Sequence, residues 1–352
     1  MSVIPDFLPS LDSLAAQQAA QRLDRLTKPP GSLGRLERLA VELAAIQGQA
    51  LPRVAPPAML VFAADHGVAA EGVSAFPQEV TAQMVANFAA GGAAINVFAR
   101  QHGAHLEVID VGVATPLPDG AGDSPRLVDE RVRLGTANML NEDAMSPDEA
   151  LAAMAAGRRA AERAAAAGCR SLIVGEMGIA NTTASSALLA ALTGASVEGL
   201  VGPGTGLDAA GLAHKRDVIE RTLAARRPDP ADPLEALARV GGLEIAAMAG
   251  AFLGGATHRL PLIVDGFIAT VAALVACRLR PSLRDYLLFG HRSREPGHEV
   301  ALAALEARPL VDFELRLGEG TGAALAFPLL DSACRLLAEM ATFDDIGIDA
   351  AP

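Results

Sequence analysis

Residues 171–183 read Ser-Leu-Ile-Val-Gly-Glu-Met-Gly-Ile-Ala-Asn-Thr-Thr, a short apolar run followed by glycines and polar side chains. The run at 171–175 is typical of a buried β-strand, and residues 178–183 are typical of the start of a helix. A strand that leads directly into a helix is the first part of a βαβ unit, in which strands lie parallel. This stretch therefore predicts an α/β fold.

Four further apolar runs are each followed by turn or polar residues and then by a helical stretch. These predicted strands are residues 58–64, 105–111, 260–264 and 286–289. Short strands that alternate with longer Ala- and Leu-rich stretches favour a mainly parallel, Rossmann-like sheet with helices on both faces. Residues 197–201 are a possible additional strand.

Helical patterns precede and follow the predicted strands. The chain has 352 residues, whereas single hydrophobic cores usually stop growing at roughly 250–300 residues. Residues 10–26 and 321–341 have helical patterns, and Ser32 is a suitable N-cap for a helix that reaches about Gln47. We expect a small helical domain built from both chain ends, with its N-terminal part at 1–50. A large α/β domain then covers 51–310, and residues 311–352 hold a glutamate loop and C-terminal helices.

Composition restricts the class of partner. The formal net charge is −12 and aromatic residues make up 3% of the chain, whereas nucleic-acid binding needs basic surface and aromatic faces. The N-terminus lacks a basic start followed by an apolar segment, and no apolar run reads as a membrane span. Cys169, Cys277 and Cys334 are far apart and form no CxxC pair. We expect a cytoplasmic protein with no nucleic-acid or membrane partner, and no metal or other cofactor.

Acidic, basic and glycine residues follow the predicted strands at the point where each strand ends. In parallel sheets, ligands bind in the crevice beyond the carboxyl ends of the strands, so we expect these residues to share one site. Taken singly, Asp110 and Asp265 are ordinary capping residues, and Asp65-His66 is better explained by helix capping or loop bracing than by metal binding. The strand exits are Asp65-His66-Gly67, Asp110-Val111-Gly112, Gly175-Glu176-Met177-Gly178, Asp265-Gly266 and Gly290-His291-Arg292-Ser293.

Two glycine-containing turns are suited to phosphate binding. Residues 202–206, Gly-Pro-Gly-Thr-Gly, precede a helix that carries Lys215, and residues 178–183 open another helix with hydroxyl side chains. Backbone N–H groups at a helix start and a nearby cation favour a bound anion. Neither turn is a Walker A or GxGxxG motif, and such turns are also common without a ligand. They indicate a small phosphorylated substrate without identifying it.

A single carboxylate stands between glycines in residues 315–322, Leu-Arg-Leu-Gly-Glu-Gly-Thr-Gly. Glycines on both sides allow the backbone to approach a ligand closely and leave the Glu319 carboxylate unobstructed. Glu319 also lies just before the predicted helix at Thr321, where acidic residues commonly cap. On residue type alone, a catalytic role and a capping role are both open.

These segments occur in the order found in one family. The chain resembles the nicotinate-nucleotide:dimethylbenzimidazole phosphoribosyltransferases, which make the lower-ligand nucleotide of cobalamin. The resemblance implies transfer of 5-phosphoribose from nicotinate mononucleotide to 5,6-dimethylbenzimidazole, giving α-ribazole 5′-phosphate and nicotinate, by a homodimer. The matching stretches span nearly the whole chain: LTKPPGSLGRLE (26–37), ADHGVAAEGVS (64–74), VTAQMVANF (80–88), GEMGIANTT (175–183), VGPGTGL (201–207), LPLIVDGF (260–267) and LRLGEGTGAALA (315–326).

The resemblance also implies roles for individual residues. Glu319 matches the family's catalytic glutamate, which as a general base would remove the azole N–H proton, with inversion at the anomeric carbon. Glu176 matches a second functional glutamate, which positions the ribose or stabilises positive charge at the reacting carbon. The remaining matches line the base pocket (Phe76, Met84, Leu317), hold the phosphate (Gly178, Asn181, Thr182, Gly204, Lys215) or close over the substrate (His291, Arg292, Ser293).

Two other classes of protein share parts of this pattern. A nicotinamide-dependent dehydrogenase needs a GxGxxG turn with an acidic residue about 20 positions on, and the segment after residues 58–64 lacks that turn. A catalytically silent carrier of a base or nucleotide would have the same motifs. The preferred base also stays open, because other family members carry small polar or amide residues where this chain has Phe76 and Met84.

Overall fold

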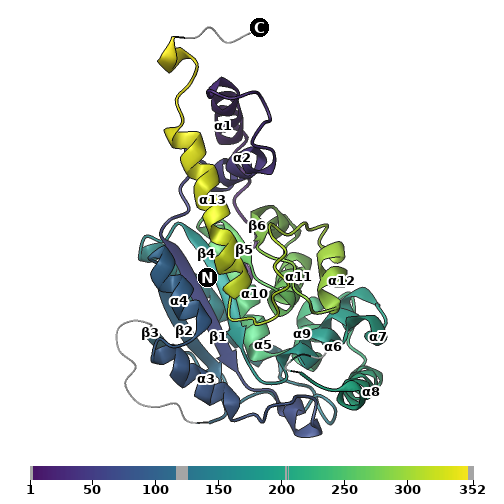
Figure 1. Cartoon of the computed structure of the whole chain (residues 1–352). Helices are drawn as coiled ribbons and strands as arrows, with labels where there is room; N and C mark the ends of the chain where they lie inside the picture. Colours follow the sequence, from purple (N-terminus) through teal and green to yellow (C-terminus); the bar gives the residue numbers. More distant parts are fainter. Residues whose placement is uncertain (1–2, 116–125, 203, 205, 348–352) are drawn as a thin grey trace.

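One six-stranded sheet forms the centre of the computed structural model, which describes residues 3–115, 126–202, 204 and 206–347 (Figure 1). The strand order is β3-β2-β1-β4-β5-β6, and every neighbouring pair is parallel. The predicted parallel α/β fold is therefore confirmed. The strands are β1 (Pro57–Ala64), β2 (His105–Gly112), β3 (Arg126–Asp129), β4 (Ser171–Met177), β5 (Leu262–Val264) and β6 (Leu287–Phe289).

Helices connect the strands, and further helices precede β1 and follow β6 in the chain. The α-helices of the described residues are α1 (Ser13–Arg25), α2 (Arg35–Gln47), α3 (Val80–Ala89), α4 (Ala94–His102), α5 (Pro147–Ala166), α6 (Asn181–Thr193), α7 (Val197–Leu200), α8 (Ala209–Arg226), α9 (Pro233–Val240), α10 (Leu243–Thr257), α11 (Phe267–Leu279), α12 (Gly297–Ala304) and α13 (Thr321–Glu339). Short 3₁₀ helices cover Gly67–Glu71, Pro281–Tyr286 and Asp344–Ile346.

Helices cover both faces of the sheet, as the side chains of β1 show. Successive side chains of a strand point to opposite faces. Leu60 and Phe62 belong to the apolar cluster that contains α5, α6, α9, α10 and α11. Met59 and Val61 belong to a second cluster with α2, α3, α4 and α13. All eight residues of β1 are buried, as expected for a parallel sheet with helices on both sides.

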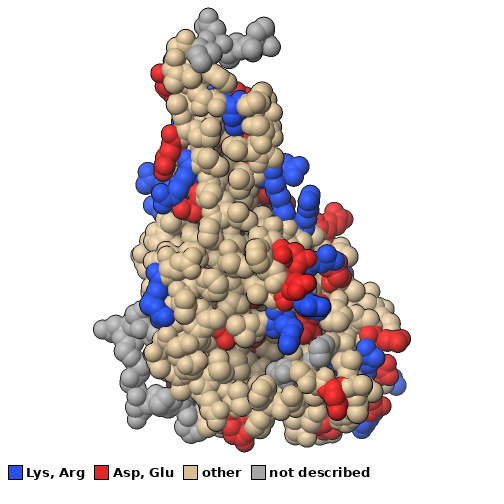
Figure 2. Space-filling model, in the orientation of Figure 1, with Lys and Arg blue, Asp and Glu red and all other residues tan. Residues whose placement is uncertain are grey.

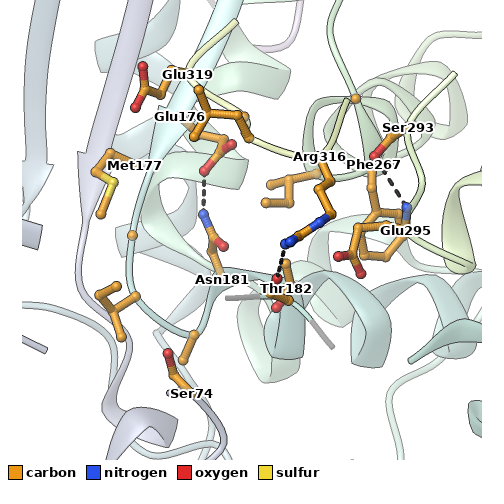
Figure 3. A pocket seen from close by; sticks show the side chains of 18 of the residues that line it. Ser74, Glu176, Met177, Asn181, Thr182, Phe267, Ser293, Glu295, Arg316 and Glu319 are labelled. Atoms are coloured by element: carbon orange, nitrogen blue, oxygen red, sulfur yellow. Dashed lines mark hydrogen bonds between the residues drawn. The ribbon is translucent and has the colours of Figure 1, made fainter. Parts of the chain in front are cut away.

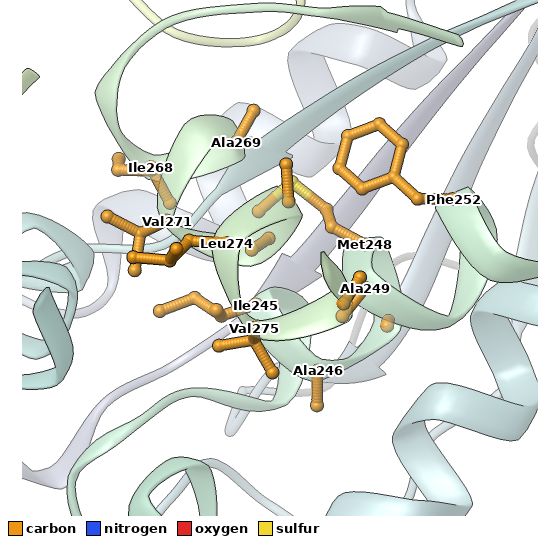
Figure 4. Close-up of a cluster of buried hydrophobic side chains, with 14 of the residues drawn as sticks. Ile245, Ala246, Met248, Ala249, Phe252, Ile268, Ala269, Val271, Leu274 and Val275 are labelled. Atoms are coloured by element: carbon orange, nitrogen blue, oxygen red, sulfur yellow. The ribbon is translucent and has the colours of Figure 1, made fainter. Parts of the chain in front are cut away.

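The first of these layers is held by close helix packing. A side-chain carbon at Gly157 of α5 would overlap the carbonyl oxygen of Ala247, and one at Gly250 of α10 would overlap that of Met154. The two glycines therefore allow the backbones of α5 and α10 to approach each other directly. On another side, α10 packs through larger apolar side chains against α11 (Figure 4).

The chain ends meet in a helical unit beside the sheet. In Figure 1, α1 and α2 lie beside the upper half of α13, whose lower half lies on the sheet. The Arg22 side chain donates a hydrogen bond of 2.7 Å to the Leu337 carbonyl, and Leu26 forms a β-bridge with Thr342. This contact between the two chain ends is what a small domain built from both termini requires. The residue bounds expected for the domains stay a prediction.

Two described segments, 80–102 and 321–339, are long and apolar enough to cross a membrane by length and composition alone. The first consists of α3 and α4, separated by residues 90–93, and the second is α13. Both supply buried side chains such as Phe88 and Phe327 to the cluster on the sheet, as core helices do. Figure 2 shows acidic and basic side chains interspersed on one face of the molecule, without a large basic area.

The structure corrects two expectations about strands. Residues 197–201 do not form a strand, because residues 197–200 are the short helix α7, in which Val197 and Leu200 are buried three positions apart. That spacing places both side chains on one face of a helix. Strand β3 was not expected, since its four residues begin with Arg126 and end with Asp129 and lack an apolar run.

Two helix starts also differ from expectation. Ser32 is not an N-cap, because α2 begins at Arg35 after Gly34, whose φ of 58° is left-handed. The turn before α2 is held by Glu37, which accepts a hydrogen bond of 2.9 Å from the Leu33 N–H and lies 2.9 Å from the Lys28 ammonium. Helix α1 begins at Ser13, where Asp12 accepts a hydrogen bond of 2.9 Å from the Ala15 N–H.

Candidate active site

A cavity of about 350 Å³ lies where the strand order reverses. The chain runs outward from β1 to β3 on one side and from β4 to β6 on the other, so the loops after β1 and β4 separate and leave a crevice. Figure 3 shows this pocket from close by. The residues that the family resemblance assigns to the site line it, except Arg292: Phe76, Met84, Glu176, Gly178, Asn181, Thr182, Gly204, Lys215, His291, Ser293, Leu317 and Glu319. The expectation that all five strand exits share one site is wrong for Asp65-His66-Gly67 and Asp110-Val111-Gly112, which do not line this cavity.

Glu176 lies at the end of β4, in register with Phe62 of β1, and its side chain is buried. Burial, together with the negative charges of Glu244 and Asp265, raises the pKa of Glu176 to about 8. The Asn181 amide donates a hydrogen bond to one carboxylate oxygen and opposes this rise. At neutral pH the side chain therefore carries a proton and can donate it in a hydrogen bond.

The turn that carries Glu319 has three consecutive left-handed residues. The φ angles are 89° at Gly318, 63° at Glu319 and 85° at Gly320. A non-glycine residue in this region costs roughly 1–3 kcal/mol and persists only when the surroundings hold it. Here Asp265 holds it, because its carboxylate accepts hydrogen bonds from the N–H groups of Gly320 at 3.2 Å and Ala323 at 2.9 Å. The expectation that Asp265 acts as a cap is confirmed, although it caps α13 from β5 and also lines the cavity.

The carboxylate of Glu319 is buried, with 5% of the residue exposed. Burial raises its pKa, a backbone hydrogen bond from Ile95 opposes the rise, and the charge of Asp265 adds to it. Ile95 belongs to the first turn of α4, whose N-cap Ala93 has no capping side chain. The oxygen Oε2 has no hydrogen-bond partner among the described residues. Glu319 thus contacts a helix start and still presents an oxygen that can accept a proton.

The opposite end of the cavity is suited to an anion. Helix α6 begins after Ala180, which has no side-chain cap, and its N-terminal end favours an anion. The N–H groups of Asn181 and Thr183 donate to the carbonyls of Gly178 and Ala180, which leaves Thr182 as the residue of this turn suited to contact a ligand. The Lys215 ammonium donates a hydrogen bond of 2.7 Å to the Thr182 hydroxyl. Lys215 is 1% exposed, and burial lowers its pKa to about 8. Gly204 lies beside Thr182 and Lys215, since a side-chain carbon there would be 3.1 Å from the Thr182 hydroxyl and 3.4 Å from the Lys215 ammonium.

The wall beside the carboxylates is apolar. Phe76 and Leu317 are about half exposed at the cavity, and Met84 lies on α3 with part of its side chain buried. Val73 and Val80 line the same side. Large apolar side chains that stay exposed on a cavity wall are suited to a flat apolar ligand.

Two charged residues of the cavity were not predicted as site residues. The Arg316 guanidinium donates a hydrogen bond of 3.2 Å to the Gly204 carbonyl, and Glu295 is buried with 6% of the residue exposed. Arg316 belongs to the glycine-flanked segment 315–322, which was predicted to lie at the site, but the sequence did not show that the Arg316 side chain points into the cavity. Glu295 lies six residues after β6, and no motif distinguishes it from a surface glutamate.

Other strand-exit residues have structural contacts. Arg292 pairs with Glu299 at 2.5 Å and does not line the cavity, which corrects the expectation that it closes over the substrate. His291 does line it, with Nε2 3.6 Å from Asp265 Oδ1. His66 pairs with Glu244 at 2.8 Å, which confirms the loop-bracing interpretation.

Asp110 also has the capping role that was expected. Its Oδ1 accepts hydrogen bonds from the N–H groups of Gly112 and Val113, and its Oδ2 pairs with Arg131. Among the residues that the structure describes, no group of three or more His, Cys, Asp or Glu side chains is placed to hold a metal ion. The predicted turn at 202–206 is described only in part, since residues 203 and 205 lie outside the described residues.

Comparisons with known proteins agree over nearly the whole chain. A family model described as phosphoribosyltransferase matches residues 8–348. The nicotinate-nucleotide–dimethylbenzimidazole phosphoribosyltransferase of Azotobacter vinelandii is 58% identical over 339 residues, which are 96% of this chain and 95% of the relative. The protein of the same name from Pseudomonas aeruginosa is 54% identical, covering 97% and 96%. A crystal structure of such an enzyme from Thermus thermophilus is 51% identical, with a TM-score of 0.90, and covers 97% of this chain and all of that one.

Proposed function

Because this chain belongs to the nicotinate-nucleotide–dimethylbenzimidazole phosphoribosyltransferase family, we propose that it transfers 5-phosphoribose from nicotinate mononucleotide to 5,6-dimethylbenzimidazole. The products are α-ribazole 5′-phosphate and nicotinate, and the step belongs to assembly of the cobalamin nucleotide loop. The observation that carries the proposal is one cavity with a buried lysine at one end, two buried carboxylates at the other and an apolar wall.

Glu319 is the general base of this reaction. Nicotinate leaves from a positively charged ring nitrogen and needs no proton, whereas the incoming azole must lose the proton of its second ring nitrogen. A positioned base contributes about 10²–10⁴ in rate to such a step. The burial that raises the pKa of Glu319 brings its basicity closer to neutral pH, and its Oε2 has no partner among the described residues.

Glu176 positions the ribose. The alternative role, stabilising positive charge at the reacting carbon, requires an ionised carboxylate, whereas the pKa of Glu176 is about 8. A neutral carboxylic acid is suited to hydrogen bonding with a sugar hydroxyl. Because a β-linked nucleotide becomes an α-linked product, the base and nicotinate lie on opposite faces of the ribose, as a single displacement requires.

The phosphate binds at the start of α6. Lys215, Thr182 and the backbone at Gly178 and Gly204 supply the cation, hydroxyl and close approach that a phosphate needs. Asn181 links this end to the other through its hydrogen bond with Glu176. His291 and Ser293 complete the wall beside the phosphoribosyl group.

The dimethylbenzimidazole lies against Phe76, Met84 and Leu317. Its ring is flat and apolar, so burial of apolar area supplies most of its affinity.

We also propose a cytoplasmic homodimer. The three cysteines are free and buried, and Phe7 and Phe313 are large apolar side chains that stay mostly exposed. Light scattering of the purified chain measures the oligomeric state.

An assay with nicotinate mononucleotide and dimethylbenzimidazole tests the proposed reaction. We expect release of nicotinate and formation of the azole nucleotide, both dependent on the two substrates. A dehydrogenase would need added NAD, and a silent carrier would bind a substrate without turnover. Failure to release nicotinate, with or without NAD, would exclude the proposed transfer.

A further inference from the structure

Glu295 is a buried carboxylate at the phosphate end of the cavity. It is 6% exposed, and its Oε2 has no hydrogen-bond partner among the described residues. In Figure 3 its carboxylate points toward the side of the cavity where Thr182 and Arg316 lie. A buried negative charge beside a site for a phosphate dianion is unfavourable unless another charge compensates it.

The same glycine turn contacts Glu295 and the groups that bind the phosphate. A side-chain carbon at Gly202 would overlap Glu295 Oε2 and Pro296 Cδ, so a larger residue there would displace this carboxylate. The backbone N–H of Gly204 hydrogen-bonds to Glu295, and the Gly204 carbonyl accepts from Arg316. Gly204 is also the residue beside Lys215. The carboxylate and both cations therefore surround one small volume.

The charged groups that face Glu295 from other elements are Lys215 on α8 and Arg316 in the loop before α13. His298, whose backbone N–H donates a hydrogen bond of 3.0 Å to the Glu295 carbonyl, has a pKa that burial lowers to about 3, so its ring is neutral. Two arginines of this segment pair elsewhere: Arg292 with Glu299 and Arg294 with Glu314. The local charge is thus two cations against one carboxylate.

A bound phosphate monoester adds a charge of about −1.5 to −2 at neutral pH. Together with two cations and the Glu295 carboxylate, a dianion leaves an excess of about one negative charge in a buried site. One added proton removes that excess. We propose that Glu295 and the substrate phosphate share one proton, so that binding of the phosphorylated substrate is coupled to proton uptake.

This inference rests on the proposed phosphate site and adds a role for Glu295 in recognition rather than in the transfer itself. Because the complex holds one more proton than the separate partners, affinity falls as pH rises, by up to about tenfold per pH unit. Lys215, with a pKa of about 8, causes a further loss at higher pH when it loses its own charge. Because Lys215 and Glu176 both have a pKa of about 8 and begin to titrate near pH 7.5, the contribution of Glu295 is isolated by comparing the wild type with Glu295→Gln between about pH 6.5 and 7.5.

Calorimetric titration with nicotinate mononucleotide, in the absence of the azole, measures the coupling directly. The heat is recorded at pH 7 in two phosphate-free buffers with different ionisation enthalpies, and the difference gives the number of protons exchanged. We expect the wild-type protein to take up about one proton. Glu295→Gln should take up well under half a proton, whereas Glu295→Asp keeps a carboxylate and should keep the uptake. Glu299→Gln, an exposed change on α12, is the matched control and should behave as wild type.

The dissociation constant supplies a second readout between about pH 6.5 and 7.5. It should rise with pH in the wild type and rise much less in Glu295→Gln, where only groups such as Lys215 still titrate. Equal proton uptake by wild type and Glu295→Gln, or no uptake by the wild type, would overturn the coupling. Either result with intact nicotinate release would leave the proposed transferase activity standing, whereas absence of any nicotinate release would count against that activity itself.

Discussion

The two ends of the cavity use the same residue type in opposite surroundings. Glu176 has burial and three neighbouring carboxylates that raise its pKa, and only the Asn181 amide opposes them. Burial raises the pKa of Glu295 as well, but the charges of Lys215 and Arg316 oppose that rise. For Glu319, burial again raises the pKa, the backbone hydrogen bond from Ile95 opposes the rise, and the charge of Asp265 adds to it. Burial raises the pKa of all three glutamates, and the comparison teaches that the charges around each one decide how strongly that rise is reinforced or opposed.

The largest expected effect is on Glu319. Glu319→Gln removes the base but keeps the size of the side chain, so kcat should fall by about 10²–10⁴ while the KM for the mononucleotide changes little. Steady-state kinetics with both substrates measures this. Glu314→Gln is a matched control, because Glu314 is also left-handed, with φ 56°, but is exposed. A near-wild-type kcat in Glu319→Gln would mean that another residue is the base, and Glu176 would be the first candidate to test.

At the phosphate end, Lys215→Met should act on binding. Loss of a charged hydrogen bond to the phosphate costs about 1.5–3 kcal/mol, so KM for nicotinate mononucleotide should rise about 10- to 100-fold. The apparent affinity for the azole should change far less. Arg221→Met, an exposed change on the same helix, serves as control. An equal loss for both substrates would indicate a damaged fold rather than a lost phosphate contact.

Glu176→Gln should give a smaller effect on rate and a gain in stability at high pH. The folded pKa of about 8 lies above the ordinary 4.5, so the wild-type protein loses stability as pH rises through this interval. Glutamine resembles the neutral acid and does not titrate. The free energy of unfolding of the variant should gain on the wild type by up to about 1.4 kcal/mol per pH unit.

Urea unfolding at pH 6, 7 and 8 measures that difference, and kcat at pH 7 should fall by only about tenfold or less, as expected for loss of a single hydrogen-bonding contact. A stability difference that does not change with pH would mean that Glu176 is already ionised in the folded protein. Its role would then return to stabilising charge at the reacting carbon.

The smallest effect is expected at the apolar wall. Phe76→Ala removes part of the surface against which the base packs, and about 1–3 kcal/mol is the usual range for such contacts. Because Phe76 is half exposed, we expect the lower end of that range. The ratio of kcat/KM for dimethylbenzimidazole and unsubstituted benzimidazole should narrow. Phe313→Ala, exposed and outside the cavity lining, should leave the ratio unchanged.

The sequence predicted the sheet because its strands are continuous apolar runs, and burial on both faces requires such runs. It failed at β3, which has only four residues and charged ends, and at α7, where valine and leucine three positions apart resembled a strand. Ser32 failed as a cap because Gly34 and the Lys28–Glu37 pair set the start of α2 instead. Local residue type does not reveal such contacts.

For the candidate site as well, the sequence predicted some residues and missed others. The strand exits after β4, β5 and β6 contribute residues to the cavity because parallel strands end at one edge, whereas Asp65-His66-Gly67 and Asp110-Val111-Gly112 do not line it. A family resemblance supplied residues such as Phe76 and Met84 that no periodicity distinguishes. Glu295 and Arg316 were missed, because their burial and direction depend on loops packed from distant parts of the chain. Arg292 was included wrongly, since its pairing with Glu299 on α12 turns it away from the cavity.

The central claim, that Glu319 removes the azole proton, is tested most directly with an acceptor that has no such proton. 1,5,6-Trimethylbenzimidazole can attack through its free ring nitrogen, but the other nitrogen carries a methyl group. The ratio of wild-type to Glu319→Gln transfer rates should fall from about 10²–10⁴ with dimethylbenzimidazole to within about tenfold with this acceptor. An equally large ratio with both acceptors would contradict the general-base role of Glu319.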